Sequence, residues 1–137
     1  MRHPLTALAS LVAVLAAGTA TPQEAVKAAP SVMEVMTTMT VPASDAIFSA
    51  ASEPPKEAAQ WVALRASAKV LADSGRVLTT IARAEDDAEW IEMARALVTE
   101  AEATFTAIDQ KDADALSKTG DDVFLTCKTC HDRFKTE

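Results

Sequence analysis

The sequence has very little glycine, no asparagine and no tyrosine; only three of its 137 residues are glycine. The tight turns of hairpin-built β proteins depend on Asn-Gly, Asp-Gly and similar pairs, so an all-β domain is excluded. Cysteine is also scarce: Cys127 and Cys130 are the only two, which excludes a disulfide-stapled scaffold. Acidic residues outnumber basic ones by 20 to 13, and the net charge of −7 argues against nucleic acid as a partner.

Alanine, in contrast, is abundant. It accounts for 29 of the 137 residues, and hydrophobic residues together make up 49% of the chain. Alanine is the strongest helix former but fills a protein core poorly. The composition therefore predicts a helical protein whose interior is short of large side chains.

The first twenty residues have the pattern of a secretory signal peptide. Arg2 lies in a short charged start, residues 5–17 carry no charge, and the small residues 18–20 suit a signal peptidase. The uncharged run is shorter than the ~20 residues that a membrane-spanning helix needs. We therefore expect residues 1–20 to be cleaved, leaving a soluble periplasmic protein without stable membrane insertion.

The remaining chain divides into a flexible tether, residues 21–30, and one domain, residues 31–137. Within the domain, apolar side chains recur at steps of three and four residues in four stretches with short connections. Pro42 interrupts the first stretch, which we expect to be one helix, kinked or broken there. The pattern predicts an all-α fold, an antiparallel four-helix bundle. Its repeating positions are Val32, Met36, Met39, Ala43, Ala46, Ile47 and Ala50; Trp61, Leu64, Ala68, Leu71, Gly75 and Leu78; Trp90, Ala94, Leu97, Ala101, Phe105 and Ile108; and Leu116, Gly120, Val123, Cys127, Cys130 and Phe134.

Cys127, Cys130 and His131 form a C-x-x-C-H motif, the attachment signature of c-type haem. Residues i, i+3 and i+4 share one face of a helix. Two thiols can therefore form thioethers with the haem vinyl groups while the adjacent imidazole binds the iron. The motif predicts one covalently attached haem c per chain.

Two other interpretations of the motif fit the sequence less well. A structural zinc site needs four ligands, yet His131 is the only histidine beyond the expected signal and no third cysteine exists. A thioredoxin-like dithiol lies at the start of a helix, whereas this motif lies near the end of the last predicted helix. Haem fits best, and because it would fill the alanine-lined core, we expect the apo-protein to be poorly folded.

The stretch from Cys127 to Lys135 continues the motif with an aromatic residue three positions after His131 and a base four positions after it. In this it resembles the class II c-type cytochromes, the cytochrome c′ family, in which C-x-x-C-H lies near the C-terminus of a four-helix bundle. The resemblance covers about residues 31–135. It implies that Cys127 and Cys130 are the thioether links, that His131 is the proximal iron ligand, that Phe134 packs beside the ring, and that Lys135 lies near the haem edge or proximal pocket.

In that family the first helix presents one residue over the iron. A methionine there gives a six-coordinate, low-spin electron carrier, whereas an apolar side chain leaves a five-coordinate iron open to small gases. The first stretch contains Met33, Met36 and Met39. Met36 lies on the apolar face in either helical register of the first stretch, so we expect it to be the distal ligand, a thioether that raises the reduction potential. The alternative is that all three methionines fill the core.

These observations predict a periplasmic single-electron carrier with His131 and Met36 as axial ligands and a redox protein as its partner. The alternative is a five-coordinate, cytochrome c′-like protein that binds nitric oxide or carbon monoxide. Enzyme activity is not expected, because peroxidase chemistry needs a distal acid-base residue and no second histidine remains after signal cleavage. The family's pairing through its first two helices would allow a homodimer. A basic partner could be attracted by Glu85, Asp86, Asp87, Glu89, Asp121 and Asp122.

Overall fold

The computed structural model describes residues 29–81 and 87–135, in which every regular element is helical. The predicted helical class is thus confirmed. The expected signal, residues 1–20, and most of the tether, residues 21–30, lie outside the described residues. The elements are α1 (Val32–Val35), the π-helical turn η1 (Met36–Thr40), α2 (Val41–Ser52), α3 (Ala58–Leu78), α4 (Asp87–Gln110) and α5 (Ala113–Phe134).

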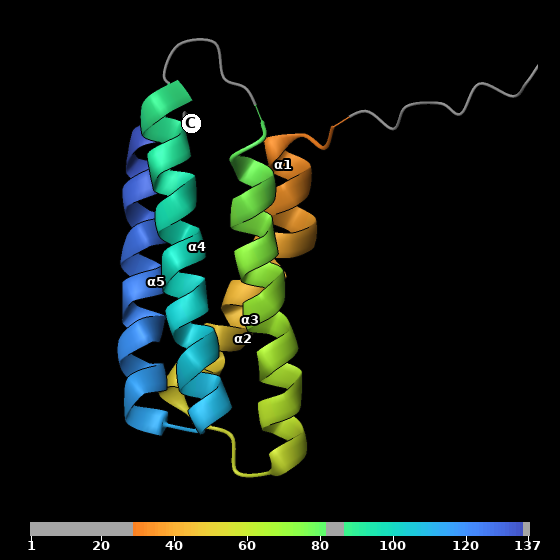
Figure 1. The fold of residues 1–137 in the computed structure, drawn as a ribbon, viewed down its shortest axis with the longest axis vertical. Helices are drawn as coiled ribbons and strands as arrows, with labels where there is room; N and C mark the ends of the chain where they lie inside the picture. Colours follow the sequence, from red (N-terminus) through yellow and green to blue (C-terminus); the bar gives the residue numbers. More distant parts are fainter. Residues whose placement is uncertain (1–28, 82–86, 136–137) are drawn as a thin grey trace, which may run out of the picture.

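Helices α3, α4 and α5 lie side by side along the long axis of the molecule (Figure 1). The chain ascends α3, descends α4 and ascends α5 in that view. Elements α1, η1 and α2 follow one another without a break and cross diagonally behind α3, so that α2 packs against both α3 and α5. Four helical segments therefore surround one core.

The helices begin and end at residues with clear local causes. Ser31 caps α1 by accepting a hydrogen bond from the Glu34 amide at 3.1 Å, and Asp112 caps α5 by accepting one from the Ala115 amide at 2.9 Å. Lys111 ends α4 by adopting a positive φ of 53°. The connections after Ser52 and after Gln110 are short, residues 53–57 and 111–112.

The core contains most of the predicted periodic positions. In α3, every one of these positions is buried, and the same face of α4 and α5 supplies large side chains such as Ile108 and Leu116. Much of the remaining core is alanine, as the composition predicts. The buried alanines are Ala43, Ala50, Ala68, Ala72, Ala94, Ala101 and Ala107.

Pro42 does not break the first helical segment. It lies in the first turn of α2, and the irregularity appears in the preceding turn, where the Val41 amide donates to the carbonyl of Met36, five residues back. A proline ring crowds the carbonyl of the preceding helical turn, and a wider π turn relieves such crowding. The chain therefore stays helical through Pro42 at the cost of one irregular turn.

Two glycines lie where neighbouring helices are in close contact. A Cβ added at Gly120 would lie 2.7 Å from the Cβ of Ala51, which places α5 directly against α2. A Cβ at Gly75 would lie 2.8 Å from Cγ2 of Val98, which places α3 against α4. In contrast, no Cα of η1 comes within 8 Å of a Cα of α5. The first helical segment thus touches α5 at Gly120 and separates from it toward η1.

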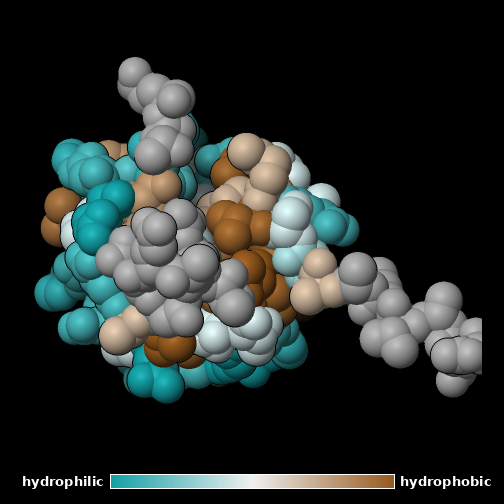
Figure 2. Space-filling model, turned by 90° about the horizontal axis from the view of Figure 1, so that it is seen from above, coloured by the Kyte–Doolittle hydropathy of each residue, from teal (hydrophilic) through white to brown (hydrophobic). Residues whose placement is uncertain are grey.

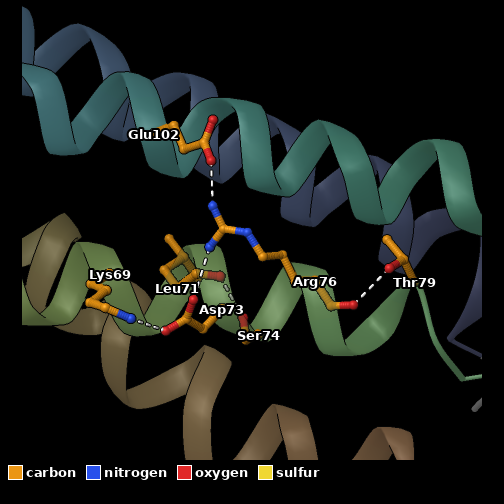
Figure 3. A network of polar contacts seen from close by, with 7 residues as sticks. All are labelled: Lys69, Leu71, Asp73, Ser74, Arg76, Thr79 and Glu102. Atoms are coloured by element: carbon orange, nitrogen blue, oxygen red, sulfur yellow. Dashed lines mark hydrogen bonds and ion pairs between the residues drawn. The ribbon is translucent and has the colours of Figure 1, made fainter.

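A polar network on the surface joins α3 to α4 (Figure 3). Asp73 accepts hydrogen bonds from Lys69 at 2.5 Å and from Arg76 at 2.9 Å, and Arg76 also donates to Glu102 on α4. These pairs are largely exposed, so they orient the two helices more than they stabilise them. In the part of the chain that the structure describes, no helix combines the length and apolar character that crossing a membrane requires.

Candidate functional site

A cavity of about 400 Å³ lies where the first helical segment separates from α5. Its walls come from η1 and α2 on one side, from α4 and the end of α3 on another, and from the last three turns of α5. The end of the molecule seen from above shows apolar surface near its centre, with hydrophilic surface around it (Figure 2). The cavity volume falls in the range typical of cofactor and small-molecule sites, roughly 300–1,000 Å³.

The three residues of the C-x-x-C-H motif all line this cavity. Cys127 and Cys130 are half-buried on the inner face of α5, and His131, one residue further, is more exposed but still borders the cavity. Their spacing of three and four residues within one continuous α-helix gives them a shared face. The structure therefore brings the two thiols and the imidazole to one cavity, as attachment of a single flat group requires.

Among the three methionines of the first helical segment, Met36 alone lines the cavity. Met33 is 70% exposed, and Met39 packs half-buried against the core outside the cavity. Met36 belongs to η1, whereas His131 belongs to α5, and both line the cavity. The structure thus places His131 and Met36 on different walls of the same space.

A fourth methionine, Met93 on α4, also lines the cavity and is absent from the sequence-based site. It follows Trp90 by three residues and precedes the buried Ala94, so it lies at the edge of the apolar face of α4. Helical spacing could have indicated it. The resemblance does not indicate it, because it implies a distal residue from the first helix alone.

Large apolar side chains form much of the remaining wall, beside the polar residues Thr40, Ser44, Asp45, Thr126, Lys128 and Asp132. Phe48 on α2 and Phe124 on α5 meet edge to face with ring centroids 6.0 Å apart, and both border the cavity. Trp90 is fixed by a hydrogen bond from its Nε1 to the carbonyl of Leu78 at 2.8 Å. Ordered aromatic and aliphatic walls of this kind suit a flat, largely apolar ligand.

Phe134 and Lys135, which the resemblance assigns to the haem pocket, do not border the cavity. Phe134 packs edge to face on Trp90 with ring centroids 5.3 Å apart, and the Arg133 guanidinium lies over its ring at 5.2 Å. Lys135 is exposed beyond the last turn of α5. The structure places Phe134 behind Trp90, so the contact with the cavity is made by the tryptophan.

The electrostatics of the motif differ from those of a redox dithiol. Burial raises the pKa of the Cys127 thiol, and the neighbouring Cys130 raises this pKa further. Reactive dithiols have thiol pKa values lowered by a helix N-terminus or a nearby cation. Among residues 29–81 and 87–135, no three His, Cys, Asp or Glu side chains gather into a group that could hold a metal ion.

The acidic residues proposed to attract a partner have different surroundings. Glu89 pairs with Arg133 at 3.0 Å and Asp122 with Lys118 at 2.6 Å, whereas Asp121 is exposed. Glu85, Asp86 and the side chain of Asp87 lie outside the described residues. Two of these carboxylates are thus already neutralised locally, which weakens their long-range field.

Comparison with known proteins does not assign the chain to a family. No protein-family model matches it, and no curated protein or solved structure does so either. A functional interpretation therefore depends on the motif and on the cavity that the motif lines.

Proposed function

We propose that this protein is an exported single-electron carrier, an antiparallel four-helix bundle holding one covalently attached haem c, similar to the class II c-type cytochromes. One observation carries the proposal. Cys127, Cys130, His131 and Met36, each singled out from the sequence, line one apolar cavity although they come from two separate helical segments.

The side chains present fit a haem group. Cys127 and Cys130 would hold it through thioether bonds, and His131 and Met36 would supply a nitrogen and a sulfur ligand from different walls. When bound, haem supplies the one-electron chemistry. The protein's own contribution would be the apolar part of the cavity wall, formed by Leu78, Trp90, Leu97 and the two phenylalanines, which with a thioether ligand would favour the reduced state.

The place of Met36 in the cavity supports the electron-carrier function, which requires a methionine sulfur there; in the gas-binding alternative Met36 lines the cavity without binding the iron. An electron carrier needs no acid-base group at the cavity; His131 is the one histidine that lines it, and the carboxylates of Asp45 and Asp132 line it as well. The expected signal peptide would deliver the chain to the periplasm. Recovery of the protein from the periplasmic fraction with a mature N-terminus near residue 21 would support that location.

Visible absorption of the purified protein tests the proposal directly. We expect a sharp, split reduced spectrum, a sulfur-to-iron band in the oxidised form, and no response to carbon monoxide. Mass spectrometry should show the polypeptide plus one haem, lost when both Cys127 and Cys130 are changed to serine. A broad high-spin spectrum that shifts with carbon monoxide would favour the gas-binding alternative, and absence of haem absorption would refute both.

The role of Met36 is tested by a matched pair of substitutions. Met36→Ala should abolish the sulfur-to-iron band and open the site to carbon monoxide. Met33→Ala removes an exposed methionine three residues away and should leave the spectrum unchanged. An unchanged spectrum in Met36→Ala would show that this thioether does not bind the iron.

A further inference from the structure

Two buried hydroxyl groups interrupt the apolar wall formed by η1 and α2. Thr40 and Ser44 are only 5% and 6% exposed, and both line the cavity. Among the described residues, the other buried polar side chains are Ser74 and Thr104, and neither borders the cavity. The chain thus offers two buried hydroxyls at the cavity and two comparable ones away from it.

The hydroxyls at the cavity are held less tightly than the others. Away from the cavity, Ser74 donates to the carbonyl of Leu71 at 2.7 Å (Figure 3), and Thr104 donates to that of Glu100 at 2.8 Å. At the cavity, Ser44 donates to the carbonyl of Val41 at 3.1 Å. These separations matter because O–H···O hydrogen bonds weaken beyond about 3.0 Å.

Thr40 is held more weakly still, and the π turn is the cause. Its hydroxyl donates at 3.4 Å to the carbonyl of Val35, five residues back, because the wide turn moves the usual i−4 carbonyl out of line. A buried hydroxyl with so long a bond loses little by turning its proton toward another acceptor. Thr40 and Ser44 can therefore donate into the cavity at small cost.

The helix packing places these hydroxyls opposite the motif. Ala51 lies against Gly120, and Phe48 lies against Phe124. Each helical turn toward the N-terminus of the first segment is therefore matched by one turn toward the C-terminus of α5. Continuing this correspondence brings Ser44 level with Cys127 and Thr40 level with His131. The loosely held donors thus lie across the cavity from the expected iron ligand.

We infer that Thr40 and Ser44 form a hydrogen-bonding subsite for a small acceptor ligand, such as a halide, water or a diatomic molecule, bound beside the group that His131 holds. The inference rests on the proposed haem site and extends it. The subsite would be used when Met36 is displaced, and its two hydroxyls would orient the incoming ligand.

Fluoride is a suitable probe, because it binds ferric haem and accepts hydrogen bonds strongly. In the Met36→Ala holoprotein, adding Thr40→Val or Ser44→Ala should weaken fluoride binding about tenfold, the effect expected for losing a hydrogen bond to a charged acceptor. Matched controls are Thr104→Val and Ser74→Ala in the same background. They remove equally buried hydroxyls away from the cavity and should leave fluoride affinity unchanged.

The outcomes separate the two proposals. If all variants contain haem and bind fluoride with equal affinity, the subsite is refuted and the proposed haem site is not. A protein without haem absorption would refute the proposed function, and the subsite with it. If Thr40→Val fails to fold, the fluoride affinities of Ser44→Ala and Ser74→Ala still test the subsite. The carbon monoxide adduct gives an independent test: a lower C–O stretching frequency in Met36→Ala than in Met36→Ala/Ser44→Ala would support the donor role.

Discussion

At the scale of single residues, Asp73 lies in a polar network that shifts its pKa. This carboxylate accepts hydrogen bonds from Lys69 and Arg76, one turn before and nearly one turn after it on α3. The hydrogen bond from Lys69 is the main cause that lowers the pKa of Asp73 below its ordinary value, and the charges of both cations add to it. The residue is partly exposed, so solvent screens much of this interaction.

Asp73→Asn should reduce the free energy of unfolding at pH 7 by at most about 1 kcal/mol, because exposed pairs of this kind contribute little. A lowered pKa in the folded state gives stability that is present at neutral pH. It is lost as the pH falls through the folded-state pKa. Urea unfolding of both proteins at pH 7 and in acid should show the difference shrink toward zero in acid. A difference that grows in acid would contradict the assignment.

Single-residue roles could be predicted where they depend on helical spacing alone. Cys127, Cys130 and His131 share a face in any α-helix, and Met36 lies on the apolar face in either register of the first segment. Thr40 and Ser44 could not be assigned in the same way. Whether they face the cavity depends on a π turn and on the point where two helices separate. Both features follow from tertiary packing.

At the scale of elements, the position of the cavity follows from one close crossing. Gly120 lets α5 touch α2 at Ala51, and the two helices then separate toward the motif. The four helices and their approximate limits were predictable from apolar periodicity. The angle between the first segment and α5 was not, because it depends on how two small residues meet.

Gly120→Ala should destabilise the protein by about 1–3 kcal/mol, although alanine is the better helix former by about 1 kcal/mol. The added Cβ would lie 2.7 Å from the Cβ of Ala51, and neither group can rotate away. Thermal unfolding of the holoprotein measures the effect. Ser117→Ala, at an exposed position on the same helix, should change stability by less than about 0.5 kcal/mol. Equal or greater stability of Gly120→Ala would show that the crossing can widen freely.

At the scale of the whole molecule, the cavity is continuous with a core in which seven of the eighteen buried hydrophobic residues are alanine. Trp90, Ala94 and Leu97 belong to both the core and the cavity wall. A ligand that fills this space adds apolar contacts that the short side chains cannot make with one another. Cofactor binding and folding are therefore expected to be coupled.

The Cys127→Ser/Cys130→Ser protein, prepared without haem, should show less helical circular dichroism and a broader, lower thermal transition than the holoprotein. A group that binds only the folded state contributes its binding free energy to stability. The comparison needs both proteins at equal concentration and pH. A haem-free form that melts as sharply and at the same temperature would contradict this coupling.

The first helical segment is held unevenly along its length. Within the described residues, α1 and η1 pack on α3 but not on α4 or α5. Their amide protons should therefore exchange with solvent faster than those of α4, because opening this end requires fewer contacts to break than global unfolding. Hydrogen exchange followed by mass spectrometry would show the order, and equal protection of α1 and α4 would contradict it. Since Met36 belongs to this end, the residence time of its sulfur at the cavity would be governed by local opening, and ligand exchange would proceed while the other three helices stay folded.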